Sequence, residues 1–170
     1  MLKIFSDLRP FFEDNYRRIS VREYAGIRKI SPPSASKLLE TYLREGLLGR
    51  EEEHRYKFYV ANKDDAGFAA LCRAYWLQAL KKSGIIDYLE RECLASLVVL
   101  FGSLAQAEVR HGSDIDLALF SGASKAPDVG HFEKKLGRKI QILMFKKGED
   151  VKNRELMSNV MNGLILSGRW

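Results

Sequence analysis

Two pairs of residues, a glycine with a serine and two aspartates, stand out because each lies at the border of an apolar segment. Residues 101–120 run FGSLAQAEVRHGSDIDLALF, so that ten residues separate Ser103 from Asp114. A glycine-serine turn at a helix start, here Gly102 and Ser103, lets a phosphate approach free backbone N–H groups, an effect that the helix dipole reinforces. Asp114 and Asp116, about 7 Å apart on one face of an expected strand, repel each other unless a cation lies between them. Mg²⁺ or Mn²⁺ is the expected cation, because such ions combine one or two carboxylates with substrate phosphates.

Three strands are expected to position these groups. Residues 94–101 form a continuous apolar run, which is typical of a strand buried on both faces. Residues 113–120 form the second strand, with the two aspartates on one face and apolar side chains on the other. Residues 138–145 form the third strand, whose residue in phase with the aspartates is Gln141. Taken alone, each polar pair has a simpler interpretation: a turn that serves only sterics, or two exposed acids on an edge strand.

The combination resembles the signature of the DNA polymerase β-like nucleotidyltransferases. It is most similar to their minimal branch, whose usual pattern is G-S-x-A-R-G followed by S-D-x-D. The resemblance covers about residues 94–168 and includes the ending NVMNGLILSG, which is similar to the closing segment of such domains. The residues that match the pattern are Gly102, Ser103, Ala105, Ser113, Asp114 and Asp116.

This resemblance implies a metal-dependent nucleotidyltransferase domain at residues 93–170. Asp114 and Asp116 are then the catalytic and metal-binding residues, and Gly102 and Ser103 hold the terminal phosphates of a nucleoside triphosphate. The implied reaction moves a nucleoside monophosphate to a hydroxyl and releases pyrophosphate. Minimal members are often antitoxins that adenylate a helical HEPN-type toxin, so the resemblance also implies such a partner.

Two departures from the family pattern place catalytic activity in question. Gln106 and Ala107 stand where the pattern has Arg-Gly, and Gln141 stands where active members present a third acid. An amide can coordinate a cation through its oxygen, but it cannot act as a base near neutral pH. The loss of a general base typically lowers a rate by about 10²–10⁴-fold. Glu133, Glu149 or Asp150 are the carboxylates that could replace it from a neighbouring loop.

Residues 1–62 have the pattern of a small helical domain with a hairpin. Ser20 is an expected N-cap with Glu23 as its capping-box partner, and Ser31 is a second N-cap with a proline after it. Residues 47–50 and 56–60 then predict two strands joined by a charged turn. The order helix, turn, helix and hairpin resembles the winged helix-turn-helix of bacterial and archaeal transcription regulators.

The winged-helix resemblance implies contact with double-stranded DNA. A helix of such a domain enters the major groove with its first residues at base edges, while the wing lies on the backbone. The residues expected at base edges are Ser34, Ser36 and Lys37, and those expected at phosphates are Arg28, Lys29 and Arg55. The alternative is a protein-docking module, which the three glutamates at 51–53 favour because they repel phosphate.

The composition permits both resemblances. The 170 residues carry a net charge of +6, with thirteen basic and eleven acidic residues up to position 65 and fifteen against eleven beyond it. This mild excess permits contact with nucleic acid or nucleotide phosphates without demanding it.

Residues 63–92 predict linking helices with a break at Ser83 and Gly84. Cys72 and Cys93 lack metal-ligand spacing and are expected to be buried thiols.

The sequence therefore predicts an α+β chain with a winged helix-turn-helix followed by a small mixed-sheet nucleotidyltransferase-like domain. Its function is either that of the enzyme, tethered to a DNA-binding domain, or that of a catalytically weak transcription regulator of antitoxin type, binding DNA as a homodimer. A scaffold that binds neither nucleotide nor DNA is a third hypothesis. No apolar run approaches the ~18 residues of a membrane helix, and the N-terminus lacks a signal-peptide layout, so we expect a cytoplasmic protein.

Overall fold

The computed structural model describes residues 2–123, 125–146 and 153–170, and the chain divides into two compact units. The first unit consists of residues 1–72 and 107–111, and the second of residues 73–106 and 112–170. The chain therefore leaves the second unit for five residues, called here the 107–111 segment, and then returns to it. The sequence predicts a joint at residues 61–65, whereas the division of the structure falls at residues 72–73.

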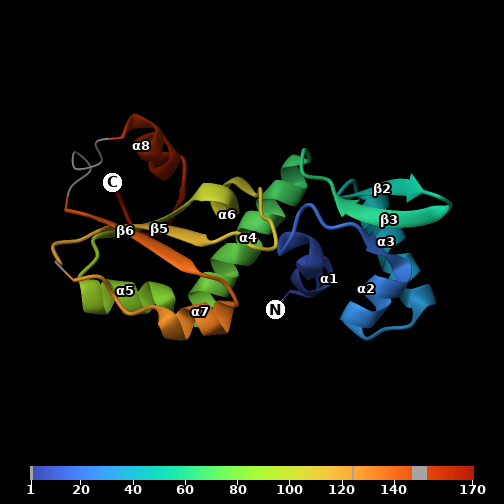
Figure 1. The fold of residues 1–170 in the computed structure, drawn as a ribbon, viewed down its shortest axis with the longest axis horizontal. Coiled ribbons are helices and arrows are strands. Elements are labelled where there is room, and N and C mark those ends of the chain that lie inside the picture. Colours follow the sequence, from blue (N-terminus) through green and yellow to red (C-terminus); the bar gives the residue numbers. More distant parts are fainter. Residues whose placement is uncertain (1, 124, 147–152) are drawn as a thin grey trace. The chain divides into compact units, whose positions relative to one another are not determined.

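The first unit combines three helices with a small antiparallel sheet (Figure 1). The strand order in this sheet is β1-β3-β2. Its elements are α1 (Lys3–Phe12), β1 (Ile19–Ser20), α2 (Val21–Arg28), α3 (Pro32–Arg44), β2 (Leu48–Glu53) and β3 (Tyr56–Ala61). Large side chains of the helices are fully buried and form its core, among them Leu8, Phe11, Tyr24 and Leu39.

Both predicted N-caps of this unit are confirmed. The hydroxyl of Ser20 accepts a hydrogen bond from the Glu23 N–H at 3.2 Å, and α2 begins at the next residue. The hydroxyl of Ser31 accepts one from the Ser34 N–H at 3.4 Å, and α3 then begins with Pro32. These local hydrogen bonds satisfy N–H groups that have no partner within the helix.

The predicted hairpin is present, but its turn is shorter than expected. The sequence predicts a charged turn over residues 51–55, whereas β2 continues to Glu53 and only His54 and Arg55 form the turn. Both turn residues have positive φ, 47° and 70°, as a two-residue hairpin requires. Arg18 explains the longer strand, because its guanidinium lies 2.8 Å from the carboxylates of both Glu51 and Glu53.

The second unit is built on a four-stranded mixed sheet. The strand order is β6-β5-β4-β7, with β5 and β6 parallel and the other pairs antiparallel. Helix α4 (Ala66–Ser83) begins in the first unit and continues into the second, where Gly84 separates it from α5 at the predicted break. The remaining elements are α5 (Ile85–Cys93), β4 (Leu97–Phe101), α6 (Gly102–Gln106), β5 (Ile115–Phe120), α7 (Gly130–Leu136), β6 (Ile140–Phe145), α8 (Arg154–Met161) and β7 (Leu164–Gly168).

Helices cover both faces of this sheet. Figure 1 shows α8 on one side of β5 and β6, and α5 and α7 on the other. Val160 of α8 packs into a buried cluster that includes Val99, Phe101, Ala118 and Phe120. The eight helices and two sheets of the described residues make this a mixed α+β protein, as the sequence predicts.

Two further observations concern single residues and helices. Cys72 and Cys93 are both buried and form no disulfide, as predicted. None of the helices in the part of the chain that the structure describes is long and apolar enough to cross a membrane.

Candidate functional site

The pairing of β4 with β5 brings the glycine-serine turn beside the second aspartate. Phe101, the last residue of β4, lies opposite Asp116 in the antiparallel register. Gly102 follows at once with a φ of +69°, in the left-handed region that favours glycine. A Cβ atom at this position would lie 2.2 Å from the Asp116 Oδ2. Glycine is favoured here, because any other side chain would strain the backbone and displace the Asp116 carboxylate.

The third strand places Gln141 next to the aspartate pair. In the parallel register of β5 with β6, Asp116 lies opposite Gln141. The Gln141 Nε2 donates a hydrogen bond to the Asp114 Oδ2 at 2.6 Å. Asp114 immediately precedes β5 and Asp116 lies within it, so the two aspartates and Gln141 come together at the start of two neighbouring strands. This agrees with the phase that the sequence predicts for Gln141.

The Asp116 carboxylate is poorly compensated. Burial first, and the Asp114 carboxylate second, raise the pKa of Asp116 above its ordinary value. Across the residues that the structure describes, no hydrogen bond reaches this carboxylate. A partly buried carboxylate beside a second one is stabilised in its charged form when a cation binds between them.

The residues at this position fit Mg²⁺ or Mn²⁺. Among the described residues, no group of three or more His, Cys, Asp or Glu side chains comes together around one point. The donor set is therefore the carboxylates of Asp114 and Asp116, because the Gln141 amide faces Asp114 with its Nε2 donor. Such a set suits Mg²⁺, which takes one or two carboxylates and completes its shell with water and substrate phosphates.

The glycine-serine turn opens α6, which has only five residues. A helix this short contributes little dipole, so an anion here would depend on individual donors, namely the N–H groups of Gly102 and Ser103 and the Ser103 hydroxyl. Leu104 and Ala105 are buried and hold the short helix in place. The guanidinium of Arg73 adds a hydrogen bond from its Nε to the Ala105 carbonyl oxygen at 2.8 Å.

Arg138 is a structural support that the sequence analysis missed. Its Nη1 donates to the Ser113 carbonyl oxygen at 2.6 Å, directly before the first aspartate. Its guanidinium also lies 4.8 Å from the centre of the Trp76 ring. These contacts fix the backbone that enters β5. No local pattern indicates them, because Arg138 is 25 residues from Ser113 along the chain.

The proposed substitutes for a third acid are partly accounted for. The Glu133 Oε1 accepts a hydrogen bond from the Ile140 N–H at 2.9 Å, so this carboxylate already supports the start of β6. Glu149 and Asp150 lie outside the described residues.

Ala107, where the family pattern has glycine, has a φ of +57°. The backbone therefore keeps the conformation that glycine favours, although the residue is alanine.

The residues expected to contact DNA lie in two environments. Ser34 and Lys37, in the first turns of α3, are exposed, as are Lys29 and Arg55, while Ser36 is half-buried. Arg28 is different, because its Nη2 donates to the Asp7 Oδ1 at 2.7 Å and its Nη1 to the Ser6 hydroxyl at 2.9 Å. Its guanidinium is therefore engaged within the unit. The contact of Arg28 with a phosphate stays a prediction, and it is the least favourable of the six.

The geometry of the second unit has a counterpart among known families. Residues 83–161 match the family model described as Polymerase beta, Nucleotidyltransferase. A search of curated proteins gave no match to this chain. The family match spans both polar motifs and the strand that carries Gln141, and it supports the predicted nucleotidyltransferase domain. Residues 1–82 lie outside it.

Proposed function

We propose that the second unit binds a nucleoside triphosphate with Mg²⁺ or Mn²⁺ and moves a nucleoside monophosphate to a hydroxyl acceptor. The close approach of the Asp116 carboxylate to Gly102 carries this proposal, because a carboxylate that can hold a cation lies against a turn that can hold a phosphate. The family match at residues 83–161 supports it. Neither motif alone has this specificity, since each is common in proteins without nucleotide chemistry.

The roles of the residues follow from their chemistry. Asp114 and Asp116 hold the divalent cation, and Gly102 and Ser103 hold the terminal phosphates. When bound, the metal neutralises phosphate charge and favours departure of pyrophosphate. The acceptor oxygen forms a bond to the α-phosphorus as the bond from that phosphorus to the bridging oxygen breaks, and the hydroxyl proton passes to water. Gln141 takes no part in the proton transfer because an amide is not a base near neutral pH.

The slow step is then activation of the acceptor. Without a third carboxylate, we expect turnover about 10²–10⁴-fold below that of an enzyme with a general base. A partner that brings its own base, or a more acidic hydroxyl, would offset this loss. We propose a hydroxyl of a partner protein as the acceptor, with a HEPN-type toxin as the partner that the family resemblance favours.

Pyrophosphate release tests this function. The full chain is incubated with each nucleoside triphosphate, Mg²⁺ and a candidate acceptor, and the same assay is run on Asp116→Asn. Asp87→Asn is the matched control, because Asp87 is an exposed aspartate of α5 in the same unit. Slow release by the native chain and the control, abolished in Asp116→Asn, supports the enzyme. Equal release by all three proteins excludes it.

A second function, regulation through DNA binding, is favoured by two observations. The first unit has the element order α1-β1-α2-α3-β2-β3 with a two-residue turn at the tip of the hairpin, the arrangement expected of a winged helix-turn-helix. The bond from Gln141 to Asp114 occupies a carboxylate oxygen that a metal would use. We propose on this basis that the first unit binds double-stranded DNA, as a homodimer, whether or not the second unit turns over.

Retention on duplex DNA at several salt concentrations tests this second function. The logarithm of the affinity falls with the logarithm of the salt concentration in proportion to the phosphates contacted. Lys29→Ala, at an exposed lysine expected to contact a phosphate, should weaken binding and lower that slope by about one. Lys82→Ala is the control, since Lys82 is an exposed lysine of α4 in the other unit. No retention at low salt rules the DNA-binding function out.

A further inference from the structure

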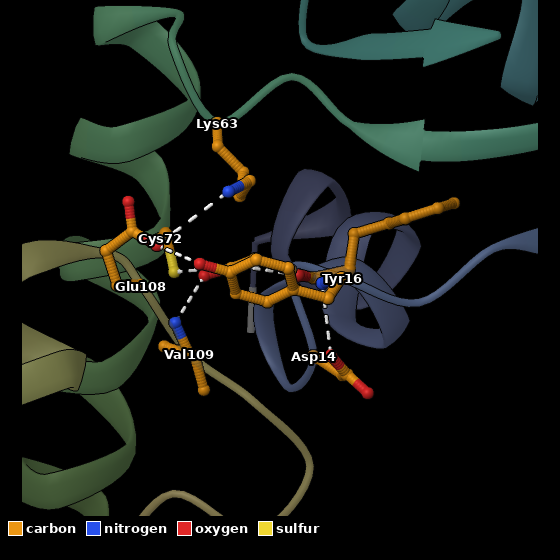
Figure 2. Close-up of polar contacts among 8 residues, drawn as sticks. Asp14, Tyr16, Lys63, Cys72, Glu108 and Val109 are labelled. Atoms are coloured by element: carbon orange, nitrogen blue, oxygen red, sulfur yellow. Dashed lines mark hydrogen bonds and ion pairs between the residues drawn. The ribbon is translucent and has the colours of Figure 1, made fainter. Parts of the chain in front are cut away.

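The 107–111 segment is embedded in the first unit through Asn15. The Asn15 N–H donates to the Val109 carbonyl oxygen at 2.8 Å, and the Val109 N–H donates to the Asn15 Oδ1 at 2.6 Å. Figure 2 marks the hydrogen bond that the Val109 N–H donates. The side chain of Val109 is fully buried, and Ala107 is 3% exposed. Asn15 thus holds both backbone polar groups of one residue from a distant part of the chain.

Asn15 is itself fixed by its surroundings. It is 2% exposed, and its Nδ2 donates to the Phe11 carbonyl oxygen at 2.7 Å, near the end of α1. The same nitrogen lies 3.7 Å from the Cys72 Sγ. Because its side-chain donor and acceptor are both used, rotation of this amide would leave buried groups unpaired, at a cost of about 1–3 kcal/mol each. Its contact with Val109 is therefore held in one geometry.

The polar residues of the segment contact the ring of Tyr16. The Tyr16 hydroxyl donates to the Glu108 carboxylate (Figure 2). Lys63 Nζ lies 4.0 Å from the centre of the Tyr16 ring and 3.8 Å from Glu108, and the Arg110 guanidinium lies 3.8 Å from the ring centre. A cation over an exposed aromatic ring contributes about 0.5–1 kcal/mol. Both the buried and the exposed sides of the segment are therefore held by the first unit.

The segment lies between the two motifs of the candidate nucleotide site. Helix α6 ends at Gln106, directly before the segment, and Asp114 follows three residues after it. A five-residue helix has too few hydrogen bonds to be stable alone. Ordering each loop residue costs about 1–2 kcal/mol of conformational entropy. The order of the α6 backbone therefore depends on its anchors, which are the Arg73 bond to Ala105 and the bonds that hold Val109 in the segment that follows.

We propose that Asn15 is a positioning residue for the nucleotide site. By binding both backbone groups of Val109, it holds the chain between the phosphate-binding turn and the aspartate pair in the conformation that binds nucleotide. The inference rests on the proposed function of the second unit, and it adds that the first unit sets the nucleotide affinity. Because coupling is reciprocal, bound nucleotide also strengthens the hold of the first unit on the segment.

The test combines nucleotide binding with amide hydrogen exchange on the full chain. A non-hydrolysable ATP analogue is titrated with Mg²⁺ into the native chain, Asn15→Ala, Tyr16→Phe and Tyr56→Phe. Tyr16→Phe removes only the hydroxyl that contacts Glu108 and tests the inference if Asn15→Ala fails to fold. Tyr56 is a tyrosine of β3 that is 70% exposed, so its phenylalanine variant is a matched control. Exchange is followed in peptides that cover residues 104–113.

The inference predicts a graded result. Exchange in residues 104–113 should quicken in Asn15→Ala and less in Tyr16→Phe, and the Kd should rise by about tenfold and about threefold. The control should match the native chain, and the analogue should slow exchange of the Val109 amide. If the native chain binds and both variants bind equally well, the inference is overturned. It is also overturned if exchange in the segment is unchanged. If the native chain binds no triphosphate, it is the proposed function that fails.

Discussion

The Asp7 carboxylate in the first unit is buried and the Asp116 carboxylate in the second is half-buried, but among the described residues only Asp7 has hydrogen-bond partners. Asp7 is 1% exposed, accepts from Arg28 at 2.7 Å and accepts from the Tyr42 hydroxyl at 2.9 Å. No hydrogen bond from the described residues reaches the Asp116 carboxylate, which lies against a glycine and near a second aspartate. The Asp7 carboxylate is thus compensated within the chain, whereas the Asp116 carboxylate is compensated only when a cation binds, as the proposed function requires.

The pKa shifts near the two carboxylates affect different groups. Burial first and Asp7 second raise the pKa of the neighbouring Tyr24 to about 12, and burial with the Asp7 hydrogen bond also raises the pKa of Tyr42. At Asp116 the raised pKa belongs to the carboxylate itself. In the first unit the raised pKa values thus belong to two tyrosine hydroxyls near Asp7. In the second unit the raised pKa belongs to the aspartate, and a bound divalent cation would lower it.

The largest expected effect on the free energy of unfolding comes from removing the Asp7 carboxylate, which has partners within the chain. Asp7→Ala removes the partner of Arg28, whose side chain is 24% exposed, and leaves the Tyr42 hydroxyl without its acceptor. We expect the free energy of unfolding to fall by about 3 kcal/mol, the lower end for a broken buried pair. Urea denaturation of the full chain measures it. A loss as small as that of the exposed control Asp87→Asn would contradict the role assigned to Asp7.

The next effect tests how closely the turn approaches Asp116. Gly102→Ala adds a Cβ that meets the Asp116 carboxylate and also strains a backbone with positive φ, so we expect a loss of about 2–3 kcal/mol. Gly84→Ala is the matched control, because Gly84 also has positive φ, +85°, but nothing lies within 4 Å of the added atom. Its loss should be about 1 kcal/mol. Equal losses in thermal unfolding would mean that the carboxylate does not crowd Gly102.

A smaller effect, that of Asp116→Asn, is a gain in the free energy of unfolding, and its size depends on pH. Because the pKa of Asp116 is raised in the folded chain, its stabilising contribution is present below the unfolded pKa and is lost as the pH rises through the folded pKa. Asp116→Asn should therefore be slightly more stable than the native chain at neutral pH without metal, by less than about 1 kcal/mol. The difference should vanish in acid and shrink when Mg²⁺ is added. A native chain that is the more stable of the two at neutral pH without metal would contradict the uncompensated charge.

The smallest effect on the free energy of unfolding comes from a change in the 107–111 segment, which contains neither Asp7 nor Asp116. Ala107→Gly relieves a positive φ of 57°, worth about 1–2 kcal/mol, but glycine loses about 0.5–1 kcal/mol more on folding. We expect a net gain of about 0.5 kcal/mol in the free energy of unfolding. A clear loss in urea denaturation would show that the alanine methyl group, which is buried, matters more than the backbone strain.

Much of the local structure could be predicted from the sequence because its causes are local. Neighbouring residues determine the caps at Ser20 and Ser31, the break at Gly84 and the strands β4, β5 and β6. The phase of Gln141 follows from the two-residue period of a strand. The approach of Gly102 to Asp116 needed the register of β4 with β5, which the sequence does not specify.

The features that could not be predicted depend on residues far apart in the chain. The turn at residues 51–55 was placed wrongly because the charges of Glu51 and Glu53 indicate a loop until Arg18 is known to pair with both. The contact of Asn15 with Val109 joins residues 94 positions apart. The sequence neighbours of Asn15 and of Val109 give no sign of this pairing.

The most direct test of the central claim is calorimetric titration of the native chain with a non-hydrolysable ATP analogue, with and without Mg²⁺. The same titration is run on Asp114→Asn/Asp116→Asn, and on the exposed control Asp87→Asn. The account predicts saturable binding that requires Mg²⁺, persists in the control and disappears in the double variant. Equal binding by the double variant would contradict it. So would the absence of binding by the native chain with analogues of all four nucleoside triphosphates.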